Sequence, residues 1–174
     1  MVEASLVNMV ETVGILVGVA IAIKQLRDID QTNEKDLETR QTQLQLNILA
    51  QTRTMNFLMR YMQLVYGQEF NTYDEWIGKY GPRADPESYT TYVYVTGMYQ
   101  NLGVLLKNNI LSTEEIAEQI RPMSFITLWK KIDPIVKHHR ETTNPTAYEP
   151  FEYLVNEMRS LLERRKAQFG TSGE

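Results

Sequence analysis

The chain opens with a run of apolar side chains that differs from everything after it. Residues 4–23 contain Glu11 as their one charged side chain, and Lys24 and Arg27 follow almost at once. A helix of this length spans about 30 Å, which matches the hydrocarbon thickness of a bilayer. The pattern therefore predicts an N-terminal transmembrane helix, with residues 1–28 forming the anchor and its juxtamembrane end.

Two other interpretations of this run stay open. The charge-free part, residues 12–23, has a length that is also typical of a buried core helix. The Ala20-Ile21-Ala22 triplet resembles a signal-peptide cleavage site, but Glu3 stands where such a peptide carries a basic residue. If the run does span the bilayer, Lys24 and Arg27 place the rest of the chain in the cytoplasm by the positive-inside rule.

Small residues recur every four positions within the run, at Gly14, Gly18 and Ala22. Such a stripe lets two helices approach closely in lipid, so it predicts self-association of the anchor. A chance pattern is the alternative, because Gly and Ala are common in membrane helices. Glu11 fits either interpretation, since an ionisable group at this depth faces protein or lies near the outer interface.

Between the run and residue 66 the chain is free of Gly and Pro, which predicts a long amphipathic helix over residues 29–66. A break is expected within residues 27–43, where charged side chains crowd together. Apolar residues follow with the a/d spacing of a helix-packing seam, and we expect this seam to be buried, either between subunits or inside one chain. The seam consists of Leu37, Leu44, Ile48, Met55, Leu58, Met62 and Val65.

After Gly67, residues that start or end helices (Gly, Pro and capping residues) become frequent. They predict a compact domain of several helices over residues 67–169 with a frayed tail at 170–174. Gly81-Pro82 should end a short helix, with Gly81 supplying a left-handed cap. The helices are expected at residues 72–80, 86–107, 113–120, 123–132, 134–140 and 149–168.

Three sequence signals set the boundaries of these helices. Asp85-Pro86 and Asp133-Pro134 each combine an N-cap with a proline in the first turn, and Ser112 to Glu115 forms a capping box. Gly97 and Gly103 lie inside one helix, so close approach of another helix is expected there. Because no sustained strand pattern occurs, the fold class is all-α.

Composition excludes several classes of chemistry. The chain has no Cys, which rules out disulfides, thiolate metal sites and cysteine nucleophiles. A net charge of −4 argues against nucleic acid as a ligand, because phosphate binding depends on a basic surface.

No motif specifies a reaction, so we expect neither an enzyme nor a bound cofactor. His138 and His139 are adjacent, and on a helix they point about 100° apart, which is unsuitable for one metal ion. They are expected at a solvated helix end, where the dipole favours imidazolium. Phosphate-binding loops and a GxSxG elbow are absent from the sequence.

Two residue groups suggest binding surfaces. The ten Tyr residues are consistent with core packing in which the hydroxyls reach the surface. The alternatives are an aromatic ligand pocket or a protein interface. Basic residues at both ends of the chain could contact an anionic lipid leaflet if the fold brings them together. These are Lys24, Arg27, Arg164, Arg165 and Lys166.

A set of packing and turn residues resembles a family of small prokaryotic helical proteins known as a domain of unknown function. The set is Trp76…Tyr80-Gly81-Pro82, Asp85-Pro86, Tyr99-x-x-Leu102-Gly103, Trp129, Pro134 and Tyr148-x-x-Phe151-Glu152-x-Leu154. The resemblance extends from the N-terminal run to about Arg159, and Asn108-Asn109-Ile110 departs from the glycine-containing turn of the family. It implies a membrane-anchored helical domain and no catalytic residues.

The sequence thus favours a non-enzymatic, single-pass membrane protein whose cytoplasmic helical domain mediates assembly. The partners would be membrane lipid and either a second copy or a larger membrane complex. The alternative is a soluble all-α domain that binds a hydrophobic or aromatic ligand, with residues 4–23 as a core helix.

Overall fold

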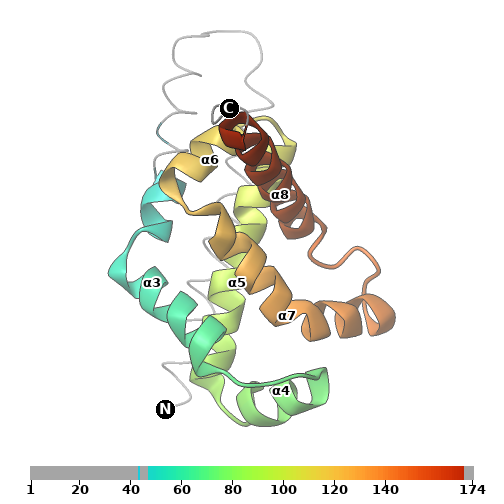
Figure 1. Ribbon diagram of the computed structural model, residues 1–174. Helices are drawn as coiled ribbons and strands as arrows, with labels where there is room; N and C mark the ends of the chain where they lie inside the picture. The colour runs from blue at the N-terminus through green and yellow to red at the C-terminus, as the bar shows by residue number, and fades with distance from the viewer. Residues whose placement is uncertain (1–42, 44–46, 171–174) are drawn as a thin grey trace, which may run out of the picture.

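The computed structural model describes residue 43 and residues 47–170, and every regular element in this part is helical (Figure 1). The all-α prediction is confirmed for these residues. None of the helices in this part combines the length and the hydrophobicity that a bilayer span requires. The expected anchor with Glu11, Gly14, Gly18 and Ala22 lies outside the described residues, as do Lys24, Arg27, Leu37 and Leu44.

The expected long helix is interrupted before the domain begins. Residues 47–52 are helical, but Thr54 is extended (φ −66°, ψ 147°) and caps a new helix, α3, over Met55–Met62. The Thr54 hydroxyl accepts the amide of Phe57 and donates to the Gln51 carbonyl at 2.9 Å. The prediction of one uninterrupted helix to residue 66 is therefore wrong. The chain turns at Thr54, and the threonine side chain makes hydrogen bonds in place of the backbone bonds that the turn removes. A π-helical turn, η1 (Gln63–Gly67), follows α3 directly.

The short helix α4 (Tyr73–Tyr80) begins and ends where the sequence indicated, although its end has another physical basis. Thr72 caps its first turn. Gly81 has φ −71°, so the expected left-handed cap is wrong. Glycine is required there because a Cβ would overlap the carbonyl oxygen of Ile77.

Helix α5 (Pro86–Lys107) has both ends fixed by local hydrogen bonds. The Asp85 carboxylate accepts the Ser88 amide at 3.0 Å. At the other end Asn109 takes the left-handed conformation (φ 54°), while the amides of Asn109 and Ile110 bond to Leu106 and Leu105. This is the Schellman pattern, with asparagine in the position that glycine usually fills.

Helix α6 (Thr113–Gln119) starts with the predicted capping box of Ser112 and Glu115. Helix α7 (Pro122–Thr142) continues through Pro134 as one helix, so the expected division into two helices at Asp133-Pro134 is wrong. Asp133 pairs with Lys137 at 2.7 Å instead of capping. Ile132 and Ile135 are fully buried on either side of the proline, and their packing offsets the one backbone hydrogen bond that proline removes.

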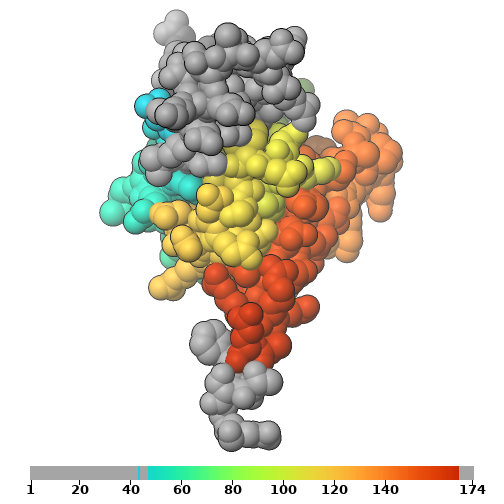
Figure 2. Space-filling view, turned by 90° about the horizontal axis from the view of Figure 1, so that it is seen from above, coloured from blue at the N-terminus to red at the C-terminus, as the bar shows by residue number. Residues whose placement is uncertain are grey.

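The final helix, α8 (Glu149–Gly170), packs along α5 and α7, and α5 stands at the centre of the bundle (Figure 1). The expected close approach is confirmed at Gly103, where a Cβ would collide with the Pro150 backbone; Gly97 is partly buried. The two ends of the bundle are formed by α4 and α6. In the space-filling view, the last turns of α8 project beyond the remaining described surface (Figure 2).

Candidate functional site

Helix α3 and the turn after it expose a row of large apolar side chains. Met55 is 72% exposed, Met59 65%, Tyr66 64%, Met62 54% and Leu58 47%. Four of these residues follow one face of α3, and Tyr66 follows in η1. We call this set the α3 face. Contiguous exposed apolar surface of this kind marks an interaction site more often than scattered single residues do.

The predicted seam is divided between the core and this face. Ile48 and Val65 are buried, but Met55, Leu58 and Met62 are exposed, so for these three the alternative of burial inside one chain is wrong. The reason is that the aromatic residues of α3 determine which of its faces packs against the core. Phe57 packs on Tyr94 and Tyr99, and the Tyr61 hydroxyl donates to the Ser124 carbonyl at 3.0 Å. Burial raises the pKa of Tyr61 to about 12, so this hydroxyl keeps its proton.

The α3 face carries no charge. Between Glu38 and Glu69 the sequence has no acidic residue. Arg53 donates to Gln119 of α6 at 2.8 Å. Arg60 donates to Asn56 and Thr91 and lies over the Tyr94 ring. Both cations thus donate hydrogen bonds within their own chain, and the five residues of the α3 face are methionine, leucine and tyrosine only.

The basic end of α8 lies at the end of the bundle where the described chain enters. Arg53 reaches α6 through Gln119, and Arg164 reaches the same helix through Glu114 at 3.4 Å. However, α6 also brings Glu114, Glu115 and Glu118 to this end, so its charge is mixed. Arg165 is partly buried and Lys166 is exposed.

Most of the tyrosines belong to an aromatic core. Tyr92 and Tyr99 are buried, and the ring of Tyr99 contacts Phe125 at 4.5 Å and Phe151 at 5.4 Å between centroids. The hydroxyls of Tyr92 and Tyr148 bond to each other. Burial raises the pKa of both tyrosines, so neither is ionised near neutral pH. Core packing is therefore the role of these residues, whereas Tyr66 and Tyr153 are exposed.

The two histidines lie near the C-terminal end of α7, as expected, but both are partly buried because their rings pack against tyrosines. The His138 ring stacks on Tyr73 with centroids 3.5 Å apart, and His139 lies 6.0 Å from Tyr148. Burial and the neighbouring His138 lower the pKa of His139, which keeps this imidazole neutral and overturns the expected imidazolium. Within the described residues no cluster of three ligating side chains could hold a metal ion.

Two surface cavities are lined mainly by polar side chains. One, of about 370 Å³, lies where α5, α7 and the start of α8 meet, and it includes His139 and Tyr148. The other, of about 440 Å³, is lined by Glu69, Phe70, Asn71, Glu75, Lys79 and Lys131. Lys131 lies 4.6 Å above the Phe70 ring. Neither cavity has the apolar lining that a hydrophobic ligand needs.

Comparison with known protein families matches residues 12–158 to DUF4760, described as a domain of unknown function. The match covers most of the chain, so the chain belongs to this family, as the residues from Trp76 to Leu154 indicated. No curated protein and no solved structure matches the chain significantly. The family description assigns no activity and no binding residue.

Proposed function

We propose that this member of the DUF4760 family is a non-enzymatic, membrane-anchored protein whose helical domain assembles with a second copy through the α3 face. One observation carries the proposal. Met55, Leu58 and Met62 have the a/d spacing of a seam between two helices, yet the chain itself leaves all three exposed. Burying such a seam removes apolar surface from water and favours association.

A second copy fits the α3 face better than a charged partner does. A two-fold interface brings identical patches together, so a patch that carries charge would face its own sign. The α3 face avoids this conflict because its five residues carry no charge, while Arg53 and Arg60 donate hydrogen bonds to Gln119 of α6 and Thr91 of α5. The long, flexible methionine side chains also suit packing against one another.

Residues 4–23 supply the anchor in this proposal, and the domain lies on the cytoplasmic side. Gly14, Gly18 and Ala22 would let two anchors pack closely, so the membrane contact and the α3 face would act together. The described chain enters at the end formed by α6 and the last turns of α8. In this orientation Lys24, Arg27, Arg165 and Lys166 would lie nearest to the lipid headgroups.

The anchor is tested by alkaline carbonate extraction of membranes from expressing cells. A spanning helix keeps the protein in the membrane pellet, whereas release into the soluble fraction would remove the membrane part of the proposal. Release would also support the alternative, in which residues 4–23 form a core helix of a soluble domain.

Assembly is tested by light-scattering mass of the full chain in mild detergent. We expect an oligomer that Leu58→Glu with Met62→Glu converts to a monomer, because burying two carboxylates without partners is costly. The matched control is Met123→Glu, which alters a methionine of similar exposure (53%) on α7 and should leave the mass unchanged.

Two results would contradict this role of the α3 face. One is a wild-type chain that is already monomeric. The other is an oligomer that survives the double substitution but dissociates with Gly14→Leu and Gly18→Leu, which would place the whole contact in the membrane.

A further inference from the structure

The cavity between α7 and α8 is built from three separate parts of the chain. Gln100 comes from α5, His139 from α7, and a connecting loop with the first turn of α8 contributes the remainder of the lining. Its volume of about 370 Å³ lies within the range of roughly 300 to 1,000 Å³ found for small-molecule sites. The lining residues from the loop and α8 are Thr143, Asn144, Thr146, Ala147, Tyr148 and Pro150.

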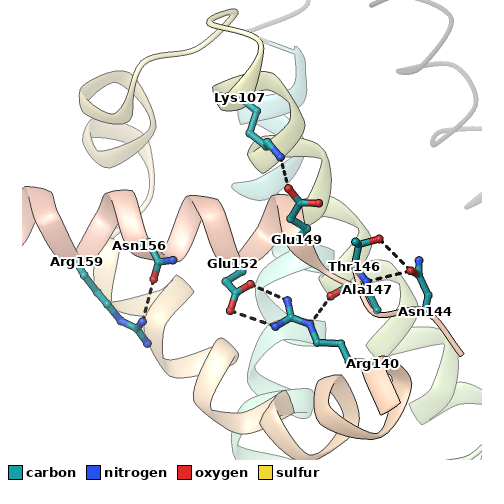
Figure 3. Close-up of polar contacts among 9 residues, drawn as sticks. All are labelled: Lys107, Arg140, Asn144, Thr146, Ala147, Glu149, Glu152, Asn156 and Arg159. Atoms are coloured by element: carbon teal, nitrogen blue, oxygen red, sulfur yellow. Dashed lines mark hydrogen bonds and ion pairs between the residues drawn. The ribbon is translucent and has the colours of Figure 1, made fainter. Parts of the chain in front are cut away.

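The loop that forms this cavity is held by hydrogen bonds although its residues are largely exposed (Figure 3). Arg140 donates to the Ala147 carbonyl at 3.0 Å, and the Asn144 side chain accepts both the amide and the hydroxyl of Thr146. Tyr148 ends the loop in the left-handed conformation (φ 62°), which is uncommon for a bulky residue. Because the loop is held in this way, the cavity is largely formed before any ligand arrives.

The surroundings of the cavity leave it without net charge. Lys107 pairs with Glu149 at 2.7 Å, and Arg140 pairs with Glu152 at 2.7 Å (Figure 3). His139 is neutral because burial lowers its pKa. An anionic or cationic ligand would therefore find no unpaired countercharge in the lining.

The start of α8 does not form an anion site either. The Glu149 amide donates to the Thr146 carbonyl, and the Glu152 amide donates to Tyr148. Pro150 has no amide proton. Two of the N–H groups at this helix start are thus already bonded, and Pro150 supplies none, which leaves fewer donors than a phosphate site usually uses.

Two polar groups of the lining are left without protein partners. Among the described residues, neither the Gln100 amide nor the His139 imidazole takes part in a side-chain hydrogen bond. The Thr143 hydroxyl shares a hydrogen bond with the Thr142 hydroxyl at 3.2 Å and keeps a lone pair that can accept another. Together, the three groups offer donors and acceptors from two different helices and the loop, beside the ring of Tyr148. A planar nucleobase would need a flat slot between two aromatic rings. A ring that carries hydroxyl groups around its edge instead suits donors and acceptors placed around one aromatic ring.

We propose that the cavity between Gln100, His139 and Tyr148 binds an uncharged, hydroxyl-rich ring of the monosaccharide class. The ring packs beside Tyr148 and Pro150, and its hydroxyls bond to the Gln100 amide, the His139 imidazole and the Thr143 hydroxyl. This site is separate from the α3 face, so its presence or absence leaves the assembly proposal unaffected.

The test is saturation-transfer NMR on the full chain in a detergent without a sugar headgroup. The probes are glucose, galactose, mannose and N-acetylglucosamine, with adenosine, uridine and inorganic phosphate as competing classes. We expect transfer to at least one monosaccharide at millimolar concentration and none to phosphate. Binding of a nucleoside without any monosaccharide, or binding of no probe, would overturn the proposal.

Two variants locate the binding in this cavity. Gln100→Leu and His139→Phe remove the hydrogen-bonding atoms and keep the approximate shapes, and each should weaken monosaccharide binding about ten-fold or more. Asn156→Ala is the control, because this exposed residue bonds to Arg159 on α8 and does not line the cavity. Equal affinity in all three variants would place the binding elsewhere and refute the assignment.

Discussion

Gly103, near the C-terminal end of α5, touches the backbone of Pro150 in the first turn of α8. A Cβ at Gly103 would overlap the carbonyl group of Pro150, and it would lie 3.1 Å from the amide nitrogen of Phe151. The contact joins the central helix to the last one, and it places the buried ring of Phe151 against Tyr99 and Trp129. The absence of a side chain at Gly103 is therefore a condition for the packing of α8.

Gly103→Ala should destabilise the domain by about 1 to 3 kcal/mol or more, because the methyl group meets rigid backbone. The matched control is Gly78→Ala in α4, where a Cβ meets nothing within 4 Å. That change should stabilise the domain by about 0.5 to 1 kcal/mol through its helix propensity. Urea unfolding of both variants measures the difference, and a loss of stability at Gly78 as large as that at Gly103 would contradict the close approach.

The two side-chain caps make a second prediction. Asp85→Ala removes the acceptor for the Ser88 amide, and Ser112→Ala removes one half of the capping box. Each should lower the free energy of unfolding by about 0.5 to 2 kcal/mol without changing the membrane fraction of the protein. Asp85→Asn should retain most of the stability, since asparagine caps equally well. A variant that leaves the membrane while it stays fully folded would show that the caps have another role.

The hydroxyl pair of Tyr92 and Tyr148 makes a third prediction. Tyr92→Phe leaves the Tyr148 hydroxyl without its partner in a mostly buried place, which should cost about 1 to 3 kcal/mol. The double variant to phenylalanine should cost clearly less than the sum of the two single variants, because no hydroxyl is then stranded. A double-mutant cycle measures this coupling. Tyr153→Phe, on an exposed ring, is the control, and strictly additive effects at Tyr92 and Tyr148 would rule out the coupling.

The neutral His139 predicts a loss of stability in mild acid. Its pKa in the folded chain lies below the ordinary value of 6.5, so below that pH the unfolded chain binds the proton more readily. The contribution of His139 is therefore fully present above about pH 6.5, and it declines as the pH falls toward the pKa of the folded chain. Asp85 and Glu115 have lowered pKa values, so their contributions are lost only in stronger acid, from about pH 4 downward.

The measurement is the free energy of unfolding between about pH 7.5 and pH 5, for the wild type and for His139→Phe. The phenylalanine keeps an aromatic ring beside Tyr73 and Tyr148 but cannot take up a proton. We expect a smaller decline in the variant than in the wild type. An equal decline in both proteins would assign the pH dependence to other groups.

Features that depend on neighbouring residues could be predicted from the sequence. The Asp85 cap, the Ser112 capping box and the start of α8 near Glu149 follow from hydrogen bonds that a few adjacent residues make among themselves. The close approach at Gly103 was also foreseen, because glycine inside a helix is unfavourable unless packing requires it. The Asn109 turn shows that the same conformation can be reached without glycine.

Features that depend on distant residues were predicted poorly. Pro134 has the same sequence context as Pro86, yet it lies inside α7 because buried neighbours hold the helix together. The cavity beside His139 could not be foreseen either, because Gln100 and Asn144 meet only after α5 and α7 have packed. The sequence did contain a signal for the buried side of α3, because Phe57, Tyr61 and Leu64 recur at helical spacing. The aliphatic seam has the same period, so the spacing alone did not distinguish the two sides.

The sequence by itself determined that this chain is helical and where most of its helices begin and end, since caps and propensities act over a few residues. Only the tertiary structure decided which side of α3 is buried. Helical periodicity makes two faces equally regular, and the choice between them rests on which one finds partners. Phe57 packs on Tyr99 and Tyr61 bonds to Ser124, and both partners are distant along the chain. This packing leaves Met55, Leu58 and Met62 on the surface.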